Sequence, residues 1–126
     1  MTIDEYNQQL REEFRPFAEA LCKLVANQVP QAEAKVWHGH PVWFIEGNPV
    51  FGYSLKKAWL EVLFWSGQSF TKSGLRPIGK FQAAGCKIES LGDVKGLTDW
   101  LQESVKIQWD YQNLPKRRSL VKLTSF

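Results

Sequence analysis

Residues 42–65 read VWFIEGNPVFGYSLKKAWLEVLFW, and this stretch decides the fold class. Three short segments within it, 42–45, 50–53 and 59–65, are rich in aromatic and β-branched residues, a composition typical of strands. The Gly-Asn-Pro sequence at 47–49 predicts a hairpin turn between the first two segments. Because so few residues separate the three segments, they predict an antiparallel meander and not parallel strands joined by crossover helices.

A helix is expected before these strands, because apolar residues recur at helical spacing over residues 3–27. Thr2 and Glu5 fit a capping box at its start. Pro16 interrupts the pattern and predicts either a kink or a second helix that begins near Arg15.

After the strands, residues 66–80 contain three glycines and a proline and predict a loop, and residues 81–91 predict one more strand. A closing helix is expected from Asp93, as its N-cap, to about residue 113. The order helix, strands, helix predicts an α+β fold, an antiparallel sheet of about five or six strands packed by an N-terminal and a C-terminal helix. We expect residues 1–115 to form a single domain and residues 116–126 to form a basic tail.

The length and composition are typical of one globular domain with many apolar side chains. The chain has 126 residues, of which 44% are hydrophobic, and it contains six tryptophans. No run approaches the roughly 20 apolar residues of a membrane helix, so we expect no membrane contact. The start MTIDEYNQQL is acidic and polar, unlike a signal peptide, which predicts a cytoplasmic protein with two reduced cysteines.

The aromatic side chains of the strands indicate a binding surface. In the segment 59–65, alternation places apolar side chains on both faces of the strand. A sheet covered by helices on one side should have one polar face, so something is expected to cover the second face. The alternatives are the chain's own tail (120–123) or 66–80 loop, a small ligand, or a second copy in a homodimer. The residues expected to line this cleft or sheet face are Trp37, Trp43, Phe51, Trp59 and Trp65.

His38 and His40 form the sharpest metal-like feature. On an extended segment residues i and i+2 share a face, so both imidazoles would bind zinc, copper or iron if a third ligand joined them. Glu33, Glu46 or Cys86 would have to be that ligand, and the sequence singles out none of them. The alternative is a pair of loop histidines bonded to backbone or water.

Residues 30–43 read PQAEAKVWHGHPVW. This stretch resembles the signature of the YdhG-like family, domain-of-unknown-function family 1801, in which P-x-A-E is followed by G-x-P and an aromatic residue. Segments 57–64 and 79–88 are similar to later blocks of that family, so the resemblance spans about residues 3–112. It implies a frataxin-like α+β sandwich. Most members have no known activity, and at least one is described as an intracellular iron chaperone.

An iron chaperone needs clustered carboxylates or imidazoles. The resemblance points to Glu5, Glu12 and Glu19 on the first predicted helix. These residues lie seven apart, about 10.5 Å at 1.5 Å per residue, which is too far for three carboxylates to chelate one ion. Asp99 and Glu103 are four apart and are expected to lie on a solvated helix face. Iron therefore remains an alternative by resemblance, and no cofactor is required.

Basic residues offer a weaker alternative, the binding of nucleic acid. The positions that would contact phosphates are Lys72, Arg76, Lys80 and Lys87, together with residues 116–118. The net charge is only +3, and no nucleic-acid-binding motif accompanies these residues. The sequence therefore favours an ordinary solvated surface at these positions over a nucleic-acid partner.

Signatures of the common enzyme classes are missing. The chain contains no GxSxG elbow, Walker A loop, HExxH or GxGxxG motif. Cys86 with His38 or His40 would make a nucleophile–base pair, but a lone cysteine in a strand is usually a small core residue. The sequence predicts a small, non-catalytic cytoplasmic binding protein whose aromatic cleft or sheet face takes a small ligand or a second copy of the chain.

Overall fold

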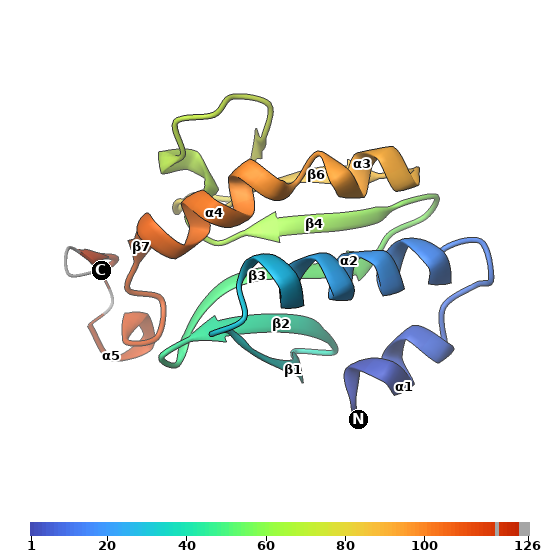
Figure 1. Cartoon of the computed structure of the whole chain (residues 1–126). Coiled ribbons are helices and arrows are strands. Elements are labelled where there is room, and N and C mark those ends of the chain that lie inside the picture. Colours follow the sequence, from blue (N-terminus) through green and yellow to red (C-terminus); the bar gives the residue numbers. More distant parts are fainter. Residues whose placement is uncertain (118, 124–126) are drawn as a thin grey trace.

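The computed structural model describes residues 1–117 and 119–123. Six strands form one antiparallel sheet in the order β1-β2-β3-β4-β6-β5 (Figure 1). The strands are β1 (Glu33–Trp37), β2 (His40–Ile45), β3 (Asn48–Leu55), β4 (Leu60–Phe64), β5 (Arg76–Pro77) and β6 (Ala84–Ile88). The predicted antiparallel meander is confirmed, since β1 to β4 follow one another both along the chain and across the sheet.

The longer helices gather on one side of this sheet, where α2 and α4 cross in front of the strands in Figure 1. The described helices are α1 (Ile3–Gln8), α2 (Arg15–Gln28), the short 3-10 helix η1 (Gly67–Ser69), α3 (Leu91–Lys95), α4 (Thr98–Lys106) and α5 (Leu114–Arg117). A sheet covered on one face by helices is the α+β arrangement expected from the element order.

The core lies between the sheet and the helices. In β4 burial alternates strictly, with Leu60, Val62 and Phe64 at 0% exposure and the residues between them half-buried. Period-two alternation is what a strand with one face on a core produces. From the helix side, Leu21 on α2 and Leu101 on α4 are also at 0% exposure and close the core.

The N-terminal part of the chain forms two helices and not one. The capping box is confirmed, because the Thr2 hydroxyl accepts from the Glu5 backbone and the Glu5 carboxylate accepts from Thr2 N. The chain then turns, and α2 begins at Arg15 as predicted, with Pro16 in its first turn. Proline is tolerated there because the backbone N–H groups of a first turn have no intrahelical acceptor.

The closing helix differs from its prediction. Its N-cap is Ser90, whose hydroxyl accepts from Asp93 N, so Asp93 lies inside the first turn. Gly96 separates α3 from α4, and α4 ends at Lys106 because Ile107 is extended. Apolar residues continue past this point and enter a strand, which is why their spacing overextended the predicted helix. The strand predicted over 81–91 is shorter as well, Ala84–Ile88.

The C-terminal segment is attached by a small second sheet and a buried amide. Strand β7 (Gln108–Trp109) pairs with β8 (Lys122–Leu123). Asn48, 3% exposed at the start of β3, donates to the Gln108 side chain and to the Trp109 carbonyl, and it accepts from Gln112 N. Part of the predicted basic tail is therefore held on the domain, while residues 118 and 124–126 lie outside the described residues.

Candidate binding surface on the helix-free face of the sheet

The sheet has a second face, opposite the helices, which we call the open face. Its members alternate along each strand with residues of the core, and ring contacts and ion pairs join them to one another. The side chains of the open face used below are Lys35, Trp37, His40, Phe44, Trp59, Glu61, Leu63, Trp65 and Lys87, with Arg76 from β5.

One aromatic cluster, the first cluster, lies over β1 and β2. The rings of Trp37 and Phe44 meet edge to face with centroids 5.4 Å apart, and the Trp65 ring lies 6.5 Å from that of Trp37. The ammonium group of Lys35 lies 4.6 Å from the centroid of the Phe44 ring. The first cluster therefore consists of three aromatic rings and one cation, from β1, from β2 and from the residue that follows β4.

Gly52 makes room for the Trp65 ring, which reaches from the end of β4 across β3. A Cβ at Gly52 would lie 3.2 Å from Trp65 Cζ3, 3.3 Å from Val42 Cγ2 and 2.8 Å from the Pro41 carbonyl oxygen. Val42, beside this ring, is fully buried although it lies on the open face. The absence of a side chain at Gly52 thus lets an indole lie close to the backbone of the sheet.

A second cluster lies at the other side of the open face. The Lys87 ammonium group lies 4.0 Å from the centroid of the Trp59 ring. Beside it, Arg76 on the edge strand β5 donates to Glu61 at 3.3 Å, and the Glu61 side chain is only 17% exposed. The second cluster therefore repeats the design of the first, an aromatic ring with a lysine over it.

Lysine side chains cover two rings of the open face, with Lys35 over Phe44 and Lys87 over Trp59. Lysine stems shield apolar rings while their ammonium groups stay in water. The loop contributes at the β6 edge, where Ile78 Cδ1 would lie 2.8 Å from a Cβ on Gly85. A lysine over an exposed ring contributes about 0.5–1 kcal/mol, whereas a base stacked on an aromatic side chain contributes about 1–3 kcal/mol. The present cover is therefore weak enough for a flat ligand to replace.

Two of the five predicted binding residues lie elsewhere. Trp43 and Phe51 are 5% and 1% exposed and pack together in the core under the helices, with ring centroids 5.2 Å apart. The composition of a strand does not say which of its alternating aromatic residues faces the helices, so the sequence grouped both faces together. Trp37, Trp59 and Trp65 are half-buried on the open face, as the prediction required.

The two histidines do not lie on one extended strand, and the His38 ring lies against the Trp37 ring with centroids 4.1 Å apart. His38 has φ +52° and forms the β1–β2 turn with Gly39, so the segment is not extended there. His40 is half-buried on β2, and its Nδ1 has no hydrogen-bond partner among the described residues. Cys86 packs against the core on the other face of the sheet. Residues 1–117 and 119–123 contain no group of three or more histidine, cysteine, aspartate or glutamate side chains arranged to hold a metal ion.

Burial and the neighbouring charges of His38 and Lys56 lower the pKa of His40, despite an opposing hydrogen bond with Pro41 backbone. The unfolded chain therefore binds a proton more readily than the folded chain, and stability is expected to fall as the pH drops below about 6.5. Urea unfolding at a series of pH values between about 5 and 8 measures this dependence. His40→Gln should flatten the profile in that range, and an unchanged profile would contradict the placement of His40.

The predicted acidic positions are dispersed. Glu5 belongs to the capping box, where hydrogen bonds from Thr2 lower its pKa, Glu12 lies in the turn between α1 and α2, and Glu19 lies on α2. The three acids do not lie on one helix, because residues 9–14 separate α1 from α2.

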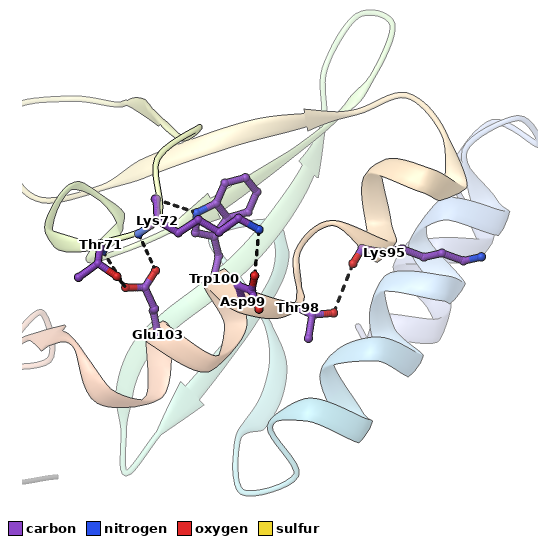
Figure 2. A network of polar contacts seen from close by, with 7 residues as sticks. All are labelled: Thr71, Lys72, Lys95, Thr98, Asp99, Trp100 and Glu103. Atoms are coloured by element: carbon purple, nitrogen blue, oxygen red, sulfur yellow. Dashed lines mark hydrogen bonds and ion pairs between the residues drawn. The ribbon is translucent and has the colours of Figure 1, made fainter.

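The acid pair on α4 binds the neighbouring loop, as Figure 2 shows. Glu103 accepts from Thr71 N, from Thr71 Oγ1 and from Lys72 N at 2.6–3.2 Å. Burial opposes its ionisation, but these hydrogen bonds outweigh burial and lower the pKa of Glu103. Lys72 pairs with Asp99 at 3.2 Å and its carbonyl accepts from Trp100 Nε1. Both carboxylates therefore anchor the loop while Asp99 remains exposed, so the predicted solvated face is confirmed for Asp99, but the two acids are not free.

The lysines and arginines named from the sequence do not form one basic patch. Lys72 is engaged on α4, Arg76 pairs with Glu61, and Lys80 lies over the Phe81 ring at 5.3 Å. Lys87 belongs to the open face, and position 118 lies outside the described residues. Among Lys72, Arg76, Lys80 and Lys87, only Lys87 places an ammonium group over a ring of the open face.

The thiols are poor nucleophiles. Burial raises the pKa of Cys86 to about 11 and also raises the pKa of Cys22. Cys22 lies within hydrogen-bond reach of the buried Tyr53 hydroxyl and of Asn7, a polar contact that ties α1 to the sheet. A thiol that stays protonated at neutral pH does not attack an electrophile readily.

The architecture defines a class, the α+β proteins with one antiparallel sheet that is covered by helices on a single face. The chain has the fold of a DUF1801-family protein, YdhG from Bacillus subtilis, whose crystal structure it matches with a TM-score of 0.56 at 17% sequence identity. The match covers 94% of this chain and 92% of the other. That family is the one which residues 30–43 resemble, and the likeness shows the fold. No protein-family model and no curated protein matches the chain.

None of the helices in the part of the chain that the structure describes has the length and apolar character needed to span a lipid bilayer.

Proposed function

We propose that this chain is a non-catalytic binding protein of the cytoplasm and that the open face is where it binds. The observation that carries the proposal is the placement of Trp37, Trp59 and Trp65, half-buried on the one face of the sheet that no described helix covers. Large aromatic side chains seldom stay partly exposed together unless they contact a partner. The ligand we favour is flat and anionic, because lysines accompany the rings.

A second copy of the chain is a poorer occupant of the open face. Two such faces in contact would bring Lys35 and Lys87 of each copy into one interface. Among the acids of the open face, Glu61 is already engaged by Arg76 and is mostly buried, whereas Glu33 is exposed on the edge strand β1, two residues from Lys35. Like charges brought together in an interface oppose association, so the charge pattern favours an anionic partner over a homodimer.

Iron binding has no support beyond the family resemblance. The same resemblance implies a frataxin-like architecture. The acids of the N-terminal region are dispersed, and Asp99 and Glu103 hold a loop. The described residues offer one imidazole in the β1–β2 turn and one on β2, and they hold no group of three candidate ligands. We therefore place ligand binding first and propose no required cofactor.

Pyrene-1-sulfonate, a flat ring system with one negative charge, tests the proposed function. We expect saturable binding, measured by fluorescence anisotropy. Trp37→Ala and Trp65→Ala should each weaken the affinity about tenfold, because each removes an aromatic ring whose stacking contributes about 1–3 kcal/mol to the binding free energy. The same samples, measured by light scattering, report the mass of the protein with and without the probe.

Phe81→Ala is the matched control, since Phe81 is an exposed ring, 39% accessible, with a lysine over it but outside the sheet. It should leave the affinity unchanged. Equal losses in Phe81→Ala and Trp65→Ala would show nonspecific adsorption. A stable dimer that dissociates in Trp65→Ala would instead identify the open face as an assembly surface and overturn the ligand proposal.

A further inference from the structure

We infer that the open face binds single-stranded nucleic acid, with unstacked bases on its aromatic rings and backbone phosphates beside Lys35 and Lys87. This inference rests on the proposed function, because it names the ligand of the same surface. Lys35, one of its two cations, is not among the phosphate-contacting positions that the sequence predicted.

The open face repeats one arrangement, a lysine over an aromatic ring. The first cluster places Lys35 over Phe44 beside the rings of Trp37 and Trp65, and the second cluster places Lys87 over Trp59. A single-stranded nucleic acid repeats in the same way, as a flat base followed by an anionic phosphate. Proteins that bind single strands combine aromatic stacking surfaces with cations along the backbone path.

The two clusters lie too far apart for one small molecule to contact both, so a ligand that contacts both must be a polymer. Lys35 lies on β1 and Lys87 on β6, which are separated by four strand spacings in the order β1-β2-β3-β4-β6. At about 4.8 Å per spacing the two strands lie about 19 Å apart. One nucleotide cannot engage both clusters, whereas an oligonucleotide can cross the sheet from one to the other. Affinity is therefore expected to rise with oligonucleotide length.

The shape of the surface selects single strands over duplexes. The rings lie on the sheet itself, and the Trp65 indole lies close to the backbone at Gly52. Bases in a duplex are stacked on one another and offer no free face to such a ring. A flat sheet also has no helix or ribbon projecting into a groove, so only unstacked bases reach the aromatic side chains.

The lysines that now cover the rings are part of the mechanism. Each ammonium group occupies the position over a ring that a base would take. When a base stacks there, the flexible lysine stem lets the ammonium group move aside to the adjoining phosphate. The cation–π contact is thereby exchanged for a stacked ring and an ion pair with the ligand.

The test measures the anisotropy of fluorescein-labelled oligothymidine and oligouridine of about twelve nucleotides, a length within the range of known single-strand sites. We expect both to bind, and we expect a duplex of equal length to bind at least tenfold more weakly. Contact with about two phosphates predicts an affinity that falls about sevenfold between 50 and 200 mM salt, at a slope of about 0.7 per phosphate.

Variants separate the two kinds of contact. Lys35→Ala and Lys87→Ala should each reduce the salt slope by about 0.7, whereas Trp59→Ala should weaken binding and leave the slope intact. Lys95→Ala is the matched control, because Lys95 is an exposed lysine on α3, on the helix side of the molecule. It should change neither the affinity nor the slope.

The outcomes distinguish this inference from the function on which it rests. Binding of pyrene-1-sulfonate without binding of either oligonucleotide would overturn the inference and leave the proposed function in place. Failure of all three probes would remove both. Equal affinity for single strand and duplex, or equal loss in Lys95→Ala and Lys87→Ala, would show a diffuse electrostatic attraction and would also overturn the inference.

Discussion

Replacing Phe64 by alanine is expected to lower the free energy of unfolding by about 3–5 kcal/mol, the usual cost of truncating a buried aromatic residue. The Phe64 side chain is fully buried at the end of β4. Its ring centroid lies 5.1 Å from that of Phe51, 5.6 Å from that of Phe70 and 6.4 Å from that of Trp100. The cavity would therefore open where the sheet, α4 and the 66–80 loop meet.

Urea denaturation followed by circular dichroism measures this loss. Phe81→Ala serves as the matched control, because the same truncation at an exposed ring should cost less than about 1 kcal/mol. If Phe64→Ala were no more costly than the control, the core would not lie where the alternation in β4 places it. Phe64→Leu should recover part of the loss by filling some of the cavity.

Gly85→Ala is expected to separate β6 from β4 and to destabilise the protein by about 1–3 kcal/mol, the range for overpacking a well-packed core. An added Cβ would overlap the Val62 carbonyl oxygen and would lie 2.8 Å from Ile78 Cδ1. The carbonyl belongs to the backbone of the paired strand and cannot rotate away. Because β6 carries Lys87, this variant should also weaken binding at the second cluster.

Gly92→Ala is the control for this substitution. A Cβ at Gly92 would lie 3.6 Å from Ser90 Oγ, an ordinary contact, and the residue lies in α3. Alanine is favoured over glycine in a helix, so this variant should be as stable as the natural protein or up to about 1 kcal/mol more stable. Amide hydrogen exchange locates the effect. Loss of protection in β6 is expected for Gly85→Ala alone, and unchanged protection there would contradict the tight β4–β6 pairing.

Much of the fold was predictable from local sequence. The aromatic and β-branched segments between residues 42 and 65 became β2, β3 and β4, and the capping box at Thr2 and the helix start at Arg15 are where the sequence predicted them. These features depend on a few neighbouring residues, whose preferences the sequence displays directly. The end of the closing helix was predicted poorly, because apolar residues that continue past Lys106 serve a strand and not a helix.

The candidate site was predictable only in part, and Trp43 and Trp65 show why. Both are tryptophans in or beside a strand, but Trp43 packs under the helices and Trp65 lies across Gly52 on the open face. Alternation separates the two faces within each strand, but only the pairing between strands, with the register shift of β2 against β3 after Trp43, fixes which face of one strand adjoins which face of the next. Lys35 and Phe44 meet for the same reason, through a pairing between strands that no local pattern reveals.

The sequence by itself determined that this protein is an α+β domain with a meander of aromatic strands, because local propensity, turn residues and hydrophobic periodicity act over a few residues. Only the tertiary structure decided which tryptophans remain at the surface, which lysines cover them, and that Asp99 and Glu103 anchor a loop. These outcomes depend on strand register and on contacts between residues far apart in the chain, and such contacts form only when the sheet and helices pack together.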